Sequence, residues 1–214
     1  MPDHRQKKLE KKKKKRSNVV HHGGSGHDQH PSEEELQLRM LEAAEGRPFG
    51  PCFVTRGWGD EGTRRLQCVI VTRQLSSELM LPIGFMVDLG SEGVKDAFPI
   101  VPTLLGDPLR AVIDKMTEWF PVGFEETTSV VATAVVLAGM KHAEKLGFPT
   151  SLKVAPMLSM LDDSDLVVEV EVPVGREGKP VYAPEINDDA RPIIRKLALA
   201  LGPDGFLVDL PEQE

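Results

Sequence analysis

Two neighbouring stretches decide the fold: residues 66–73, LQCVIVTR, and residues 79–89, LMLPIGFMVDL. Both are dense in apolar and β-branched residues, which favour strands, and the polar QLSSE segment between them predicts a turn. Pro82 lacks a backbone N–H, so we expect the second strand to start at a sheet edge or at a bulge. A shorter strand over residues 52–55 would complete a three-stranded meander.

Helices are predicted before and after this meander in the sequence. Residues 32–35, SEEE, have the spacing of a capping box and predict a short helix that Gly46 ends. The Asp-Pro pair at 107–108 predicts an N-cap followed by Pro at the first helical position. A longer helix is expected over residues 125–146, where Gly147 suits a left-handed cap.

The last part of the chain predicts a second hairpin and a final helix. Valines alternate with glutamates across residues 168–174, which is the pattern of a strand with one buried face. The GREGKP segment (175–180) would turn this strand back towards a partner at 181–183. A helix capped near residues 187–188 would end at Gly202, before a last short strand in FLVDL. The order of these elements indicates an α+β domain with a mainly antiparallel sheet and three to four packed helices.

The first sixteen residues, MPDHRQKKLEKKKKKR, are strongly basic on an acidic chain. They carry nine Lys or Arg against two acids, whereas the net charge of the whole chain is −7, so the remainder carries about −14. A lysine run repels itself and has no apolar face to bury, so we expect residues 1–31 to be a disordered arm that seeks RNA, DNA or a ribonucleoprotein. The expected phosphate contacts are Arg5, Lys7, Lys8, Lys11, Lys12, Lys13, Lys14, Lys15 and Arg16.

The rest of the chain is expected to hold a short helix, residues 32–46, and a single α+β domain, residues 47–214. The start has no apolar signal segment, and no run approaches the roughly 20 apolar residues of a membrane-spanning helix. We therefore expect a cytoplasmic protein with no membrane partner. Cys52 and Cys68 have no disulfide or zinc spacing, and no cofactor motif is present, so no cofactor is expected.

Three segments resemble a family of uncharacterised bacterial proteins that carry GVKDAF-like and GPDGF-like segments. They are FMVDLGSEGVKDAF (85–98), KHAEKLGFP (141–149) and VPVGREGKPVYAPEINDDARPIIRKLALALGPDGF (172–206). The resemblance covers most of residues 50–206, and similar proteins also carry a short lysine-rich arm. The family has no established activity, so the resemblance implies domain limits and no chemistry. Similar proteins tend to have an aromatic-Cys-Leu before the Gly-Val-Lys-Asp, where this chain has GSE (90–92).

The strongest chemical candidates are four charged residues within one short segment: Asp88, Glu92, Lys95 and Asp96. Metal-dependent nucleases place acids at strand ends, and Asp88 ends an apolar strand. The spacing matches no nuclease signature, however. The neighbouring glycines favour a tight turn in which Lys95 pairs with an acid, and recognition of a partner is a third possibility.

Histidine chemistry is confined to few positions. Five of the six histidines precede residue 31, so a histidine base in the folded part has to be His142. His142 lies on the apolar stripe of the predicted helix and is most simply a histidine at the edge of the core; the alternative pairs it with Cys52 or Cys68 in nucleophilic catalysis. Four further histidines could in principle bind a metal ion, but glycines lie between them, so ordering the segment would cost conformational entropy. They are therefore weak metal candidates: His21, His22, His27 and His30.

Two further segments resemble known motifs only superficially. Residues 175–179, GREGK, have glycines too close for a phosphate loop, and no helix follows, so they predict a hairpin turn. Residues 162–165, DDSD, lack the central glycine and terminal glutamate of a calcium loop and predict a solvated turn or a helix cap.

These features favour a noncatalytic binding or accessory protein whose basic arm contacts nucleic acid or a ribonucleoprotein. The alternative is a metal-dependent nuclease or phosphodiesterase that uses Asp88, Glu92 and Asp96. A third possibility is a protein-interaction module whose lysine tail only aids solubility. The charge of about −14 outside the tail argues against a nuclease, because an enzyme that acts on polyanions usually needs a basic groove.

Overall fold

The computed structural model describes residues 32–60, 66–184 and 189–210. The chain divides into two units, residues 1–34 and residues 35–214. All the described strands, and all but the first two described helical residues, belong to the second unit. The predicted arm, residues 1–31, lies outside the described residues.

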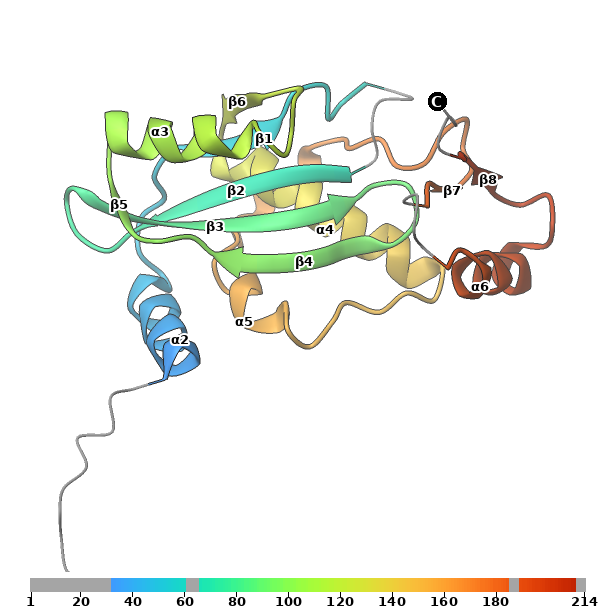
Figure 1. Cartoon of the computed structure of the whole chain (residues 1–214), viewed down its shortest axis with the longest axis horizontal. Helices are drawn as coiled ribbons and strands as arrows, with labels where there is room; N and C mark the ends of the chain where they lie inside the picture. The colour runs from blue at the N-terminus through green and yellow to red at the C-terminus, as the bar shows by residue number, and fades with distance from the viewer. Residues whose placement is uncertain (1–31, 61–65, 185–188, 211–214) are drawn as a thin grey trace, which may run out of the picture. The chain divides into compact units, whose positions relative to one another are not determined.

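A six-stranded antiparallel sheet forms the centre of the second unit (Figure 1). The predicted α+β class and the predicted meander are both confirmed, and the sheet continues beyond the meander on each side. In spatial order the strands are β4 (Gly93–Pro99), β3 (Leu79–Asp88), β2 (Leu66–Gln74), β1 (Cys52–Thr55) and β6 (Phe124–Thr127), with the two-residue β5 (Thr103–Leu104) also paired to β3.

The prediction drawn from Pro82 was wrong, because β3 is an interior strand. Pro82 is the register partner of Thr72 on β2, and on the other side its carbonyl accepts a hydrogen bond from Ile100 N at 2.8 Å. Pro82 lies between the part of β3 that pairs with β5 and the part that pairs with β4. The missing N–H therefore falls where one partner strand gives way to the next.

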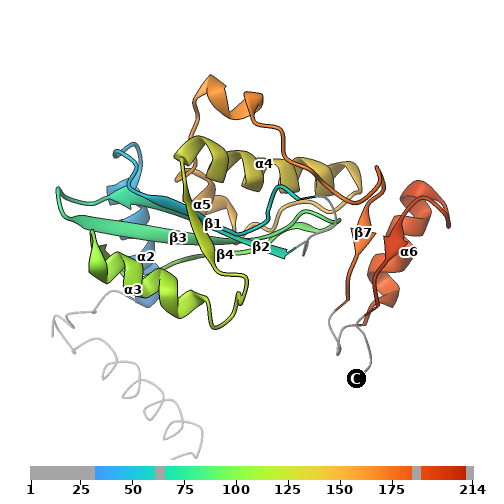
Figure 2. The same ribbon diagram turned by 90° about the horizontal axis from the view of Figure 1, so that it is seen from above.

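Helices cover both faces of the sheet, with α4 on one side and α3 on the other (Figure 2). The described residues contain five α-helices, one more than the upper expectation, because nothing in the sequence pattern marks the four-residue α5. The helices are α2 (Glu33–Ala44), α3 (Asp107–Met116), α4 (Ser129–Lys145), α5 (Ala155–Leu158) and α6 (Arg191–Leu201). A 3-10 helix, η1 (Asp165–Glu169), follows α5.

The apolar character of β2 follows from this arrangement. Val69 and Val71 belong to the core between the sheet and α4, whereas Cys68 and Ile70 belong to the core under α3. Both faces of the strand are buried, so the sequence is a continuous apolar run without polar alternation.

Two predicted helix starts were wrong. Residues 124–127 form β6, and α4 begins after Thr128, whose hydroxyl accepts a hydrogen bond from Val131 N at 3.2 Å. Antiparallel pairing with β1 therefore overrides the helical pattern of these residues. In α3 the N-cap is Gly106, and no side chain donates or accepts a capping hydrogen bond there. Asp107 is the first helical residue. The predicted end of the long helix is confirmed, since Gly147 follows it with φ +81°.

The predicted strand over residues 168–174 was also wrong. The chain there leaves η1 as an unpaired segment, and Val172 and Val174 pack against the main core. Contact with the core therefore accounts for part of the valine alternation without a ladder. Strand β7 (Val181–Tyr182) pairs instead in parallel with β8 (Leu207–Val208).

The predicted turn at GREGKP is present. Arg176 and Lys179 exchange backbone hydrogen bonds of 2.8 and 2.9 Å, and the two residues between them, Glu177 and Gly178, both have positive φ. This is the two-residue turn of a tight hairpin. The predicted cap at 187–188 lies outside the described residues, while the predicted end of α6 at Gly202 is confirmed.

Two glycines allow α4 to approach the β3–β4 hairpin closely. A Cβ on Gly93 would lie 2.6 Å from Ala143 Cβ, and Gly93 also has φ +73°. A Cβ on Gly139 would collide with Val87 Cγ1. The helix can therefore rest on this part of the sheet only because neither position carries a side chain.

Replacing Gly139 with Ala should lower the free energy of unfolding by about 1–3 kcal/mol, because the new methyl overpacks a stiff valine. Helix propensity alone would give the opposite sign, with Ala favoured by about 1 kcal/mol. Urea unfolding measures the difference. Gly59→Ala is the control, because its Cβ would meet open space and its change should stay within about 0.5 kcal/mol. A stabilised Gly139→Ala protein would contradict the close approach.

Candidate functional site

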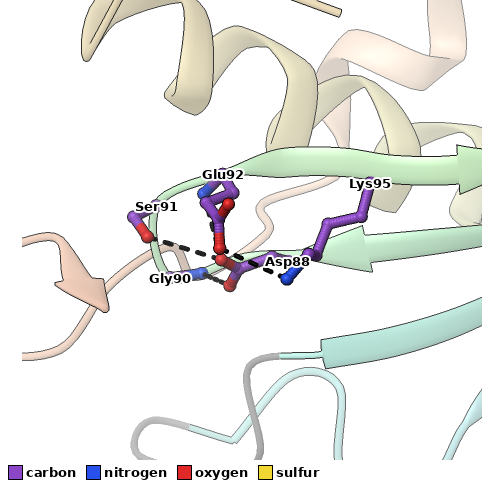
Figure 3. A network of polar contacts seen from close by, with 5 residues as sticks. All are labelled: Asp88, Gly90, Ser91, Glu92 and Lys95. Atoms are coloured by element: carbon purple, nitrogen blue, oxygen red, sulfur yellow. Dashed lines mark hydrogen bonds and ion pairs between the residues drawn. The ribbon is translucent and has the colours of Figure 1, made fainter. Parts of the chain in front are cut away.

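The turn between β3 and β4 contains the candidate charged residues. Asp88 ends β3 and is only 7% exposed. Its carboxylate accepts hydrogen bonds from Gly90 N at 2.7 Å, Glu92 N at 3.0 Å and Ser91 Oγ at 3.4 Å (Figure 3). A carboxylate that accepts from the backbone of the residues after it stabilises a tight turn. The Asp88 side chain therefore holds the hairpin connection in place.

Glu92, in the β3–β4 turn, and Lys95, on β4, form an ion pair. Lys95 Nζ lies 3.3 Å from Glu92 Oε2 (Figure 3). Val87 is in register with Val94 and Met86 with Asp96, so Lys95 is the extra residue of a β-bulge. The pair is partly exposed to water, and such pairs contribute about 0–1 kcal/mol.

Asp96 does not join the other three residues. It lies beyond the bulge with an exposed side chain, and its carboxylate accepts a hydrogen bond from Ala97 N at 2.9 Å. The structure thus brings Asp88, Glu92 and Lys95 together and leaves Asp96 outside. Across residues 32–60, 66–184 and 189–210, no three His, Cys, Asp or Glu side chains are arranged to hold a metal ion.

The same turn joins three parts of the fold, a role that no sequence pattern indicates. Leu89 O accepts a hydrogen bond from Gly175 N at 2.9 Å, and Gly90 O accepts one from Val181 N at 3.0 Å. Gly90 O also lies 3.0 Å from His142 Nε2 on α4. The β3–β4 turn therefore connects the sheet to α4 and to the chain that leads into β7.

His142 serves this junction as a hydrogen-bond donor. Burial lowers its pKa, and the nearby charge of Lys145 lowers it further, against the hydrogen bond to Gly90 and the charge of Asp88, which raise it. The net effect favours a neutral imidazole whose proton is on Nε2, because a carbonyl oxygen can only accept. His142 is therefore engaged in packing α4 against the turn.

Neither cysteine lies where His142 could activate it. Cys68 belongs to the core under α3, on the opposite face of the sheet from α4. Cys52 is in register with Thr127, next to the start of α4, whereas His142 lies thirteen residues along that helix, about 20 Å away along its axis. Burial raises the pKa of Cys52 to about 11 and that of Cys68 to about 12. Both thiols are therefore protonated at neutral pH and are poor nucleophiles.

The DDSD segment fastens the other end of α4. Asp162 accepts hydrogen bonds from Ser129 Oγ at 2.6 Å and from Ser164 N at 2.9 Å. Desolvation raises the pKa of Asp162, but the bonds from Ser129 and Ser164 and the charge of Arg73 outweigh it, so the pKa is lowered. The predicted turn is thus a polar clamp on the first turn of α4.

Arg73 is the charged residue that sequence reasoning missed. Its guanidinium donates to Arg47 O at 2.7 Å, Leu161 O at 2.8 Å and Met160 O at 3.0 Å, and it stacks on Phe49 at 3.4 Å from the ring centroid. The side chain is buried and joins three separate segments. The only signal in the sequence is an arginine at the end of an apolar strand.

Comparison with known proteins finds no matching family model, no matching curated protein and no matching solved structure. The resemblance to a bacterial family therefore stays a prediction. None of the described helices is long and apolar enough to cross a membrane. Two groups of predicted site residues, the basic residues of the arm and His21, His22, His27 and His30, lie outside the described residues.

Replacing Asp88 with Asn should lower the free energy of unfolding by about 1–3 kcal/mol, because the amide nitrogen cannot accept from the turn. Asp96→Asn is the matched control and should cost at most about 1 kcal/mol, since it disturbs one local, exposed bond. Urea unfolding with and without magnesium chloride measures both changes. Magnesium should leave the parent midpoint unchanged. Stabilisation by magnesium that Asp88→Asn abolishes would instead establish a metal site.

The lowered pKa of His142 makes the fold less stable in mild acid. As the pH falls below about 6.5, the unfolded chain takes up this proton before the folded protein does, so the free energy of unfolding decreases. His142→Gln should flatten this part of the profile. Urea unfolding at a series of pH values between about 7.5 and 5.5, above the carboxylate range, measures the slope. Equal slopes for parent and variant would show that His142 is not shifted.

Proposed function

We propose that this chain is a noncatalytic binding protein that contacts RNA, DNA or a ribonucleoprotein through the basic residues of its first sixteen positions. The observation that carries the proposal is the separation of charge along the chain. Nine Lys or Arg stand against two acids in that segment, while the remainder carries about −14. A concentrated positive segment attracts polyanions, and the acidic remainder keeps the rest of the chain from binding them indiscriminately.

The chemistry of this contact follows from its composition. Each Lys or Arg near a phosphate releases condensed counterions, which supplies affinity that falls steeply with salt. Such contacts position a protein on a nucleic acid but read no base. The expected binding is therefore weak, nonspecific and electrostatic. The location that we propose for the protein is the cytoplasm.

The contacts of the folded part support a noncatalytic role. The Asp88 carboxylate is engaged by three donors, and His142 is directed at the carbonyl of Gly90. A nuclease or phosphodiesterase at this turn would need Asp88 to give up those donors in order to bind a cation, and Asp96 to move beside it. Because no observation favours that rearrangement, binding through the basic segment is the better-supported proposal.

Replacing Lys11, Lys12, Lys13, Lys14 and Lys15 with Gln in the full chain should abolish most of the affinity for nucleic acid. Fluorescence anisotropy with polyuridine RNA and with a DNA duplex, at about 50 mM and about 200 mM salt, measures the change. The slope of log K against log salt should become shallower by up to about 0.7 per neutralised lysine on single strands, because each lost charge releases fewer counterions.

The control for this experiment replaces three exposed basic residues of the folded part, Arg39, Arg110 and Lys115, with Gln. It should change the affinity of the full chain by less than about twofold, since these residues belong to two different helices, α2 and α3, and form no concentrated positive segment. Tight binding that survives both the five-lysine substitution and the higher salt concentration would overturn the proposed function.

A further inference from the structure

The outer face of α4 carries two lysines near its C-terminal end. Lys141 and Lys145 are both exposed, and their spacing of four residues places them one turn apart, about 6 Å along the helix axis. Among the described residues, no ion pair involves either of them. Both ammonium groups are therefore available to an anion in solution.

A third lysine, Lys196 of α6, lies beside the residues that follow α4. Lys196 Nζ lies 4.2 Å from the centroid of the Phe148 ring, and its Cε would lie 3.5 Å from a Cβ on Gly147. Leu146 and Leu197 share one apolar cluster with Phe148, so α6 packs against the residues that follow α4. The cation–π contact holds the Lys196 side chain at Phe148, three residues beyond the end of α4.

The charge at this junction contrasts with the rest of the domain. Residues 191–201 contain three Lys or Arg and no acid, and Glu144 is the one acid among residues 141–153, which contain three lysines. At the start of α4, where Ser129 donates a hydrogen bond to Asp162, residues 162–165 contain three acids and no Lys or Arg. Residues 141–153 and 191–201 together hold six of the 17 Lys and Arg that follow residue 16, and Arg191 among them pairs with Asp189 at 2.7 Å.

Stabilisation of the helix dipole explains only part of this concentration. Lys145 and His142 lie in the last turn of α4, where a positive charge interacts favourably with the helix C-terminus. Lys141 lies one turn earlier, and Lys196 belongs to a different helix. A surface that binds an extended polyanion accounts for all three lysines, because such a ligand can contact charges on two elements at once.

We propose that Lys141, Lys145 and Lys196 form a second phosphate-contacting surface, and that it binds the backbone of the same nucleic acid that the basic N-terminal segment binds. This inference rests on the proposed function and extends it to the folded part. Three lysines read no sequence, so the ligand is the phosphodiester backbone. Because both groups of lysines belong to one chain, engagement of either raises the effective concentration of the other at the nucleic acid.

The test compares two triple variants of the full chain that change the net charge equally. One carries Lys141→Gln, Lys145→Gln and Lys196→Gln, and the other carries Arg39→Gln, Arg110→Gln and Lys115→Gln. The first should weaken binding of polyuridine RNA about tenfold and make the salt slope shallower by about 2, whereas the second should change the affinity less than about twofold. Equal effects of the two triples would overturn the inference.

Two additional variants separate a loss of folding from a loss of binding, and the inference from the proposed function. The double variant Lys141→Gln with Lys145→Gln leaves the Lys196–Phe148 contact intact. It should show about two-thirds of the change in binding free energy of the first triple variant. Because this variant keeps the packing of α6, a loss of folding cannot explain its weaker binding. The five-lysine variant of the N-terminal segment tests the proposed function separately. If it loses binding while the junction triple binds as the parent does, the inference fails and the proposed function stands. If the parent does not bind RNA, both fail.

Discussion

The close approach of α4 to the β3–β4 hairpin is the constraint on which the rest of the structure depends. Gly93 and Gly139 leave no side chain between the helix and the sheet. At this separation His142 reaches the carbonyl of Gly90, and the turn that Asp88 stabilises lies within reach of the chain leading to β7. A helix held a few ångströms further away would lose the hydrogen bond between His142 and Gly90.

The polar groups that could perform chemistry are used to maintain that packing. Asp88 accepts from its own turn, Asp162 clamps the start of α4, and Arg73 joins β2 to two other segments through their carbonyls. A buried polar group without a partner costs about 1–3 kcal/mol, so these bonds are needed wherever helices and loops meet the sheet. The lysines that we propose to contact a partner belong to the first sixteen residues and to the ends of α4 and α6 instead.

The candidate site shows how far sequence reasoning reaches. The turn, its glycines and the pairing of Lys95 with an acid follow from local composition, and the structure contains each of them. The bulge that separates Asp96 from Asp88 and the hydrogen bonds to the turn from Gly175 and Val181 do not follow, because their partners lie on other strands or many residues away. The role of Arg73 could not be predicted for the same reason, since its acceptors belong to residues far from it in sequence.

The sequence by itself determined the elements whose signals are local: the apolar strands β2 and β3, the glycine ends of α4 and α6, the turn at GREGKP, and the charge of the first sixteen residues. Backbone sterics and hydrophobic patterning act over a few residues and can be read directly. Only the tertiary structure decided that residues 124–127 extend the sheet and that residues 168–174 remain unpaired. Whether an apolar segment becomes a strand depends on which distant backbone offers it hydrogen bonds, and that choice is made by packing.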